Sequence, residues 1–451
     1  MRLYFGLTIV ALGFAGISGA PLSWDGSYIL FKILDLQSSI PAHDRFINIP
    51  LHWVVLFISH FTNDLSILQM VFGLVYAAIP LMVLVMSWWV VRGHAETLFI
   101  WAALGIGLGT LPGQFCFICE AILAVLLFWP VILAILVRMH KNHVPIVLML
   151  VIATFFAHFV SIMLFILGAG LAFAIGLRSR DDRRWMWMWA FGFGAMAALK
   201  SLIYLVSPSA YEMSQLSTDV MKFHFDIAVA GLPLMSVICT WFAASMIFIS
   251  QLLSRYPKHN FSPIIHSIGL ISLTIAGGLL VIWARDPYLW RYAIAFRSWA
   301  LFSSFPFIML AALEALIRSD QFSINEKNEW NYRLKTLRII GVVFLLVLSI
   351  QSTAWFNLTS ILRETIVQSV DSCISISSIG WLTHTPLNNW TTPSHAILLQ
   401  GKAPQKLVLN GDGCTEASFS EAIRIAPWDL RSRTGGWFDL HLSGILPAHK
   451  R

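Results

Sequence analysis

Long apolar runs dominate the chain, and most polar residues are confined to the short stretches between them. A helix needs about 20 predominantly apolar residues to cross a bilayer. Runs of that length, or nearly so, recur up to residue 356, and we expect about eleven membrane-spanning helices. They lie at 3–20, 66–91, 97–111, 118–137, 144–157, 159–177, 185–206, 226–250, 263–284, 298–317 and 336–356. The pattern predicts an all-α polytopic membrane protein.

The stretch 144–177 is too long for one spanning helix and short for two. His158 interrupts it, and basic residues stand before it, at Arg138 and Lys141, and after it, between Arg178 and Arg184. A helical hairpin that turns near His158 places both basic clusters on one side of the membrane, whereas a single span would separate them. We therefore expect two short helices here.

The composition supports a membrane protein and argues against other classes. Hydrophobic residues make up 57% of 451 positions and charged residues only 12%, whereas in soluble domains roughly a quarter of all residues are charged. The net charge is +7, but the basic residues lie in short clusters between apolar runs. This is the pattern that orients membrane helices, so we expect no nucleic-acid partner.

The positions of the basic residues predict the orientation. Of the 30 Lys and Arg residues, 15 lie in the loops assigned to the cytoplasm, and 7 lie in the opposite loops before the tail. Positive residues favour the cytoplasmic side, so we expect a multi-pass plasma (inner) membrane protein with a cytoplasmic N-terminus and a periplasmic or extracytoplasmic C-terminus. Alternatively, the first segment is a signal peptide cleaved near Ser18-Gly19-Ala20.

Two regions are too large to be simple connectors. The first outer loop, 21–65 within a transmembrane domain 1–356, contains an apolar stretch with Lys32 and Asp35 at helical spacing, which favours helices lying in the membrane interface. The tail, 357–451, is rich in Ser, Thr, Gly and Pro. Alternating runs at 395–400 and 406–410 predict two strands in a small β-rich extracytoplasmic domain. Cys373 and Cys414 are its only cysteines, and a disulfide between them is expected there.

Asp25 is the strongest candidate for chemistry, because it follows the first span closely and precedes a helical pattern in Trp24-Asp25-Gly26-Ser27-Tyr28. A carboxylate at the membrane face can act as a general base on the hydroxyl of a lipid-borne acceptor, or bind a metal. The alternative is structural, since aspartate is also a favoured N-cap of a helix. Both interpretations stay open on the residues alone.

Other ionisable residues on the same side are candidates for binding substrate. Ionisable groups at membrane depth are costly and indicate function, and arginine binds phosphate in a bidentate manner. Structural alternatives exist for most of them: a solvated acid–base pair, an interfacial histidine, or arginines that anchor headgroups. Glu120, in an apolar helix, needs a partner, which Lys200 or an outer-loop arginine can supply. The candidates are Asp44, Arg45, Glu120, His158, Arg285, Arg291 and Arg297.

The opening of the chain resembles the GT-C class of membrane glycosyltransferases, and more closely a little-characterised group of bacterial multi-spanning proteins. The resemblance rests on 24–28 with Phe31 and Leu34, on 41–51, and on Trp390, Pro393, 397–400 and Pro427-Trp428 in the tail. Ala157-His158-Phe159 falls where the group often carries Ser-His-Glu, so that glutamate is absent.

The resemblance implies a GT-C-like fold and the transfer of a sugar from a polyprenyl-phosphate donor to an acceptor at the outer membrane face. Asp25 would be the catalytic carboxylate, and Arg285, Arg291 and Arg297 would hold the lipid phosphate. Gly26 follows Asp25 where many GT-C enzymes have a second acidic residue, so the use of a divalent metal ion stays open.

The first interpretation is therefore an enzyme, a glycosyltransferase of envelope glycoconjugates whose partners are membrane lipid, a lipid-linked sugar donor and a glycan or lipid acceptor. A lipid or glycolipid transporter is the alternative, and it predicts charges at mid-span and broken helices. A non-catalytic envelope assembly protein is the third.

Overall fold

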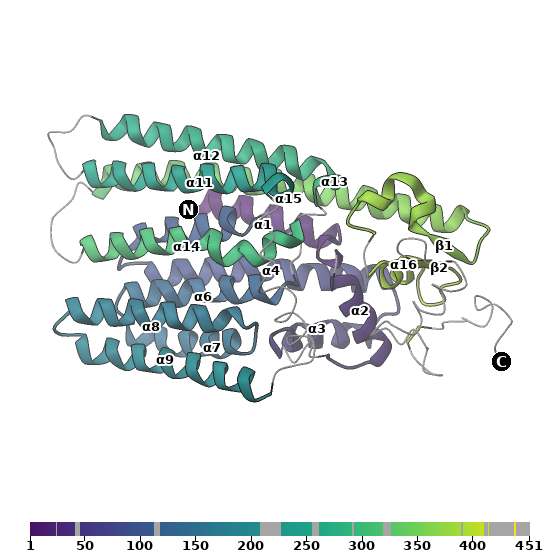
Figure 1. The fold of residues 1–451 in the computed structure, drawn as a ribbon, viewed down its shortest axis with the longest axis horizontal. Helices are drawn as coiled ribbons and strands as arrows, with labels where there is room; N and C mark the ends of the chain where they lie inside the picture. The colour runs from purple at the N-terminus through teal and green to yellow at the C-terminus, as the bar shows by residue number, and fades with distance from the viewer. Residues whose placement is uncertain are drawn as a thin grey trace.

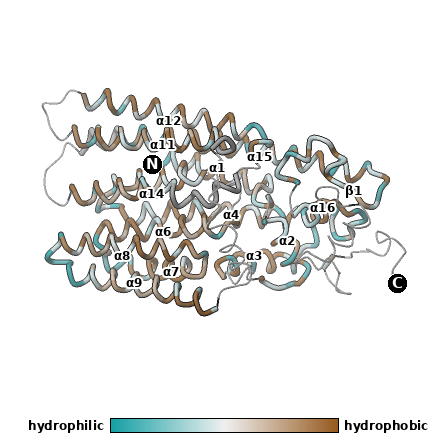
Figure 2. The backbone as a smooth tube through the Cα atoms, viewed as in Figure 1, coloured by the Kyte–Doolittle hydropathy of each residue, from teal (hydrophilic) through white to brown (hydrophobic). Residues whose placement is uncertain are grey.

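The computed structural model describes residues 1–23, 25–40, 46–111, 118–207, 227–254, 261–290, 293–318, 326–388, 391–409, 414, 437 and 438. Most of them form an elongated bundle of roughly parallel and antiparallel helices, with a smaller C-terminal region at one end (Figure 1). We call the end of the bundle that carries this region the tail end, and the other the opposite end. Apolar residues follow the helices along the bundle (Figure 2).

Every apolar run predicted to span the membrane forms a helix. The bundle helices are α1 (Arg2–Ile17), α4 (Leu65–Val91), α5 (Phe99–Leu104), α6 (Glu120–Leu136), α7 (Val144–Phe155), α8 (Val160–Arg178), α9 (Arg183–Val206), α11 (Ile227–Ser254), α12 (Ser262–Arg285), α14 (Ala293–Arg318) and α15 (Glu326–Gln368). A π-helical turn, η4 (Gly105–Gly109), continues α5.

Six helices within the described residues are long and apolar enough to cross a membrane. They are Leu65–Val91, Val160–Arg178, Arg183–Val206, Gly231–Ser254, Ser262–Arg285 and Tyr332–Gln368. The remaining predicted spans fall on shorter apolar helices. The chain is thus an all-α multi-pass membrane protein.

Helix α6 occupies the centre of the bundle. All of its 17 residues are buried, and it packs against α4, α7, α8 and α14. Its length of about 26 Å is less than the ~30 Å hydrocarbon thickness. The six residues of α5 and the five of η4 are buried as well. The middle of the bundle therefore contains short helices that are buried along their whole length.

Close backbone contacts hold the N-terminal helix in the bundle. A Cβ atom on Gly73 of α4 would lie 2.2 Å from the carbonyl oxygen of Gly16 in α1, so only glycine fits. Helix α1 also packs against α15. Small residues at helix crossings are typical of membrane bundles, where van der Waals contact rather than the hydrophobic effect drives association.

The predicted outer loop contains helices α2 (Asp25–Leu36) and α3 (Ile49–Ser59), preceded by the 3₁₀ turns η1 (Ala20–Leu22) and η2 (Phe46–Asn48). Both lie toward the tail end (Figure 1). The position of α2 in the membrane interface stays a prediction, but its charged residues Lys32 and Asp35 do not face solvent. Lys32 and Asp35 are each only 8% exposed, because α3 and a tail helix pack against α2.

The tail contains two short strands, β1 (Cys373–Ser375) and β2 (Leu407–Leu409), which pair in parallel. Between them lie the 3₁₀ segment η7 (Ile376–His384) and α16 (Thr392–Gln400). The second predicted strand is confirmed in part, but the first, 395–400, is wrong. Thr392-Pro393 begins a helix there, as proline at a first helical turn favours, and α16 is buried against α2 and α15.

The tail is tied to the bundle by polar contacts. Helix α15 continues to Gln368, past the predicted boundary at 356. Lys406 donates from Nζ to the carbonyl oxygens of Val367 at 3.2 Å and Ser369 at 2.6 Å. A cation at these carbonyls also interacts favourably with the helix dipole. Gln69 of α4 donates to the carbonyl oxygen of Leu398 in α16 at 2.8 Å.

Candidate functional site

Asp25 is the first residue of α2 and is half-buried. The chain enters α2 through a tight link after η1, and a Cβ atom on Gly26 would lie 1.9 Å from the carbonyl oxygen of Pro21. Glycine at 26 is therefore a steric requirement of this entry. The carboxylate of Asp25 lies in the first turn, where the helix dipole favours negative charge. Both predicted roles, cap and catalytic group, are compatible with this position.

Burial and, secondarily, the negative charge of Asp25 raise the pKa of Tyr28, which lies one turn further along α2. The phenol is therefore a hydrogen-bond donor at neutral pH. Ser23 and Ser27, two positions before and after Asp25 in the sequence, are buried. The start of α2 thus gathers several polar groups in a largely buried setting.

Glu120 lies in the same relation to α6 as Asp25 does to α2. It is the first residue of its helix and is 6% exposed. Asn48, at the end of η2, donates from Nδ2 to Oε1 of Glu120 at 3.3 Å. A Cβ on Gly26 would come within 3.0 Å of Cδ1 of Ile118, so the start of α2 lies beside the segment that leads into α6. Two carboxylates therefore begin two neighbouring helices at the tail end.

His158 lies in the turn between α7 and α8, where the sequence predicted the hairpin to reverse. Its Nδ1 accepts a hydrogen bond from the backbone nitrogen of Val160 at 3.3 Å. The same turn contacts η2, since the backbone nitrogen of Phe46 donates to the carbonyl oxygen of Phe156 at 3.2 Å. Because η2 also carries Asn48, the His158 turn and Glu120 are connected through one short segment.

Arg285 is the last residue of α12 and is exposed. The loop after it is fixed by Asp286, which accepts the backbone N–H of Tyr288 at 3.0 Å. The ring of Tyr288 lies 6.3 Å from that of His384 in the tail. Arg285 therefore reaches the tail end of the bundle, as Asp25 and Glu120 do.

The other predicted binding residues are not placed by the structure. Asp44, Arg45 and Arg291 lie outside the described residues. Arg297 falls within α14, in a part whose side chains are not described. The prediction of an arginine cluster around a lipid phosphate therefore rests on Arg285 alone among the described side chains.

The structure shows buried polar groups at the tail end that the sequence analysis missed. Gln351 and Ser352 of α15 are at most 1% exposed, and within the described part of the chain their side chains have no hydrogen-bond partner. The side chains of Ser394 and His395 in α16 are also buried and have no hydrogen-bond partner among the described residues. Such atoms cost about 1–3 kcal/mol each when left unsatisfied, so they indicate positions where water or a ligand binds.

Trp355 connects these groups to the start of the chain. It lies one helical turn beyond Gln351, donates from Nε1 to the carbonyl oxygen of Gly19 at 3.0 Å, and has its ring centroid 5.2 Å from that of His395. Burial lowers the pKa of His395 to about 4, so this imidazole is neutral at pH 7. The sequence could have pointed to Gln351, because it is a polar residue inside the apolar run 336–356.

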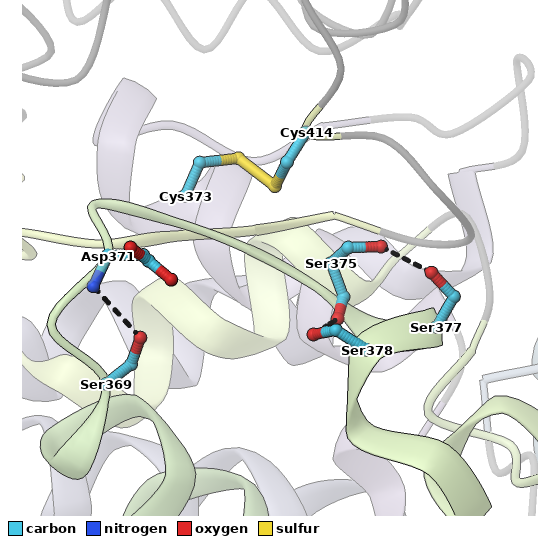
Figure 3. The surroundings of a disulfide bond; sticks show 7 residues. All are labelled: Ser369, Asp371, Cys373, Ser375, Ser377, Ser378 and Cys414. Atoms are coloured by element: carbon cyan, nitrogen blue, oxygen red, sulfur yellow. Dashed lines mark hydrogen bonds between the residues drawn. A yellow bond between two sulfur atoms is a disulfide. The ribbon is translucent and has the colours of Figure 1, made fainter.

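The disulfide expected in the tail is present. Cys373 on β1 is bonded to Cys414, with their Cα atoms 5.9 Å apart (Figure 3). Hydroxyl groups surround it, including Ser375 and Ser377, whose Oγ atoms are 2.7 Å apart. The bond closes a loop of 41 residues that contains η7, α16 and β2.

The described side chains form no ready-made set of metal ligands. In the part of the chain that the structure describes, no three or more His, Cys, Asp or Glu side chains are arranged to hold one. Asp25 and Glu120 each begin a different helix, and we assign no chemical step to a metal.

Comparisons of the chain with protein-family models, with curated proteins and with solved structures found no match.

Proposed function

We propose that this chain is a multi-spanning membrane glycosyltransferase of the GT-C kind, which transfers a sugar from a polyprenyl-phosphate donor to an envelope glycoconjugate. The observation that carries the proposal is the position of Asp25. Its carboxylate opens α2 at the tail end, half-buried, next to the segment that leads to the second carboxylate, Glu120. In this proposal all eleven apolar helices cross or enter the bilayer.

The tail end faces the non-cytoplasmic side in this proposal. Two independent features support that orientation. The loops assigned to the cytoplasm hold 15 Lys and Arg residues, against 7 in the outer loops before the tail. The tail also carries the disulfide between Cys373 and Cys414, and disulfides persist in oxidising compartments outside the cytosol.

A polyprenyl-linked donor stays in the membrane, so its reacting phosphate lies at the bilayer surface. We assign Asp25 as the base that takes the proton of the acceptor hydroxyl. The hydroxyl oxygen then bonds to the anomeric carbon, the bond from that carbon to the phosphate oxygen breaks, and polyprenyl phosphate leaves. Arg285 is assigned to the leaving phosphate, because guanidinium groups bind phosphate oxygens in pairs.

The test uses the purified full-length chain in lipid nanodiscs, supplied with polyprenyl-phosphate sugars and a mixture of envelope acceptors. Asp25→Asn keeps the shape and removes the base, and we expect transfer to fall at least about a hundredfold. Asp371→Asn changes an exposed carboxylate of the tail and should leave transfer unchanged. Transfer that survives Asp25→Asn, in protein of normal stability, would refute the assignment.

A lipid or glycolipid transporter is a second candidate, and the short central helices favour it. Both α5 and α6 are short and wholly buried, and a π-helical turn continues α5. Transporters place binding sites at interrupted helices. Proteoliposomes loaded with a fluorescent glycolipid distinguish the two functions. Movement of the lipid between leaflets without any sugar transfer would favour the transporter.

A further inference from the structure

Three histidines contact one another at the opposite end of the bundle, far from the tail. His94 follows α4, and His140 and His143 flank and end the 3₁₀ turn η6 (Lys141–His143) that precedes α7. The rings of His94 and His140 are stacked with centroids 4.1 Å apart and planes at 15°. The ring of His143 lies 5.9 Å from His94 and 5.6 Å from His140, nearly perpendicular to both.

The arrangement is that of packed rings and not of metal ligands. Two of the imidazoles lie face to face, and the described residues include no group of three such side chains arranged around a common ion position. Face-to-face stacking is tolerated between neutral imidazoles. When both rings are protonated, two positive charges 4.1 Å apart repel each other.

The segment that carries His140 is strained. Arg138 and Met139 are consecutive non-glycine residues with positive φ, +65° and +46°. Such conformations are sparsely populated and persist only where surrounding contacts hold them. The ring of Trp185 on α9 donates to the carbonyl oxygen of Met139 at 2.8 Å, and the His94–His140 stack holds the other side.

The charged groups around the cluster come from three loops. Arg92 and Glu96 lie on the His94 loop, Arg138 and Lys141 on the His140 loop, and Asp182 on the loop between α8 and α9. Asp182 pairs with Arg138 at 3.5 Å.

Burial, then the nearby His94, lowers the pKa of His140, and Asp182 opposes this in part. Burial, then the neighbouring imidazoles, lowers the pKa of His143. The closed cluster therefore binds fewer protons than an opened one. Its stability is fully present above the ordinary imidazole value of about 6.5 and is lost as pH falls below that value.

We infer that the His94–His140–His143 cluster is a proton-operated latch between the loop after α4 and the loop before α7. With neutral imidazoles, the stack holds the strained turn at 138 and 139 closed. When the stack takes up protons, the rings separate and the turn relaxes to ordinary backbone conformations. Helices α4 and α6 both lead into this latch, and α6 carries Glu120 at its other end, so the latch is connected to the candidate site.

The test is hydrogen–deuterium exchange of the full-length chain in nanodiscs, read at residues 137–144 and corrected for the intrinsic pH dependence of exchange. Between about pH 7.5 and about pH 5, which bracket the ordinary imidazole value, exchange in the wild-type segment should rise about fivefold, the factor for two unit charges ~4 Å apart in water. Combined His94→Gln and His140→Gln should abolish the rise. His60→Gln, at an exposed histidine of the tail end, should keep it.

A wild-type segment with pH-independent exchange would overturn the inference, and so would a double variant that keeps the wild-type rise. If the double variant does not fold, the titration of His140 is measured instead, by hydrogen exchange at the imidazole C2 position, in the wild type and in the single variant His94→Gln. His140 should titrate below about 6.5 in the wild type and move upward in the single variant His94→Gln. An unchanged titration of His140 in that variant would also overturn the latch.

Discussion

A buried ion pair joins α14 to α15 near the opposite end of the bundle, and its removal should be strongly destabilising. Oε1 of Glu314 lies 3.0 Å from Nη2 of Arg333, and the side chains are 2% and 1% exposed. Glu314 also accepts hydrogen bonds from Oγ1 of Thr97 at 2.9 Å and from Nε1 of Trp101 at 2.7 Å. Arg333 donates in addition to the carbonyl oxygen of Thr97. The pair therefore holds α14, α15 and the segment before α5 together.

The expected magnitude follows from this burial. Glu314→Gln keeps the shape of the side chain but leaves the guanidinium of Arg333 buried without its counter-charge, and breaking such a pair costs about 3–5 kcal/mol. Glu314→Met combined with Arg333→Met removes both charges and both desolvation penalties. Because apolar replacement of a whole buried pair is often neutral or stabilising, the double variant should unfold within about 1 kcal/mol of the wild type.

The assay is reversible unfolding in mixed micelles, followed as a double-mutant cycle with the single variants. The control is Asp182→Asn, which breaks the exposed pair with Arg138, where the side chains are 37% and 46% exposed. Exposed pairs contribute at most about 1 kcal/mol. A loss below about 1 kcal/mol for Glu314→Gln, or a double variant as unstable as the sum of the two single ones, would refute the reasoning.

Three further predictions concern the tail end. Gly26→Ala should destabilise the start of α2 and reduce any Asp25-dependent activity, because its Cβ has no room, whereas Gly13→Ala, with open space around it, should be neutral in both assays. Lys406→Met should cost about 1–2 kcal/mol and speed hydrogen exchange at the end of α15, since three carbonyl groups lose a charged donor, while Lys402→Met should not. Burial holds the pKa of His395 in the folded protein at about 4, so between about pH 6.5 and 4 only the unfolded chain binds a proton there. The free energy of unfolding should therefore fall by up to about 3 kcal/mol as the pH is lowered across that window. His395→Gln should remove that pH dependence.

The sequence was informative where a single local rule applies. Asp25 was expected to open a helix, and it does. The turn near His158 was expected from the positions of basic residues, and the chain reverses there. In the tail, by contrast, the run 395–400 has the alternation of a strand but forms a helix. Most of this helix is buried, so the alternation of apolar and polar residues does not indicate which side faces the protein interior.

The candidate site depends on contacts that local patterns do not encode. Asn48 and Glu120 are 72 positions apart and form a hydrogen bond, and Trp355 reaches Gly19 across 336 positions. Arg333 lies just before the apolar run 336–356, where the sequence predicts an exposed loop, yet it is buried in an ion pair. The chemistry of a charged residue therefore depends on the partner that the fold brings to it.

The sequence by itself determined that this chain is a helical membrane protein, because the length and hydropathy of its apolar runs follow from the thickness and polarity of the bilayer. Only the tertiary structure decided which apolar helices face lipid and which lie inside. Helix α6 is buried all round, whereas only one side of α7 is buried, although both are similarly apolar in sequence. Lipid tails and protein interiors are equally apolar, so hydropathy cannot separate them, and packing between helices decides.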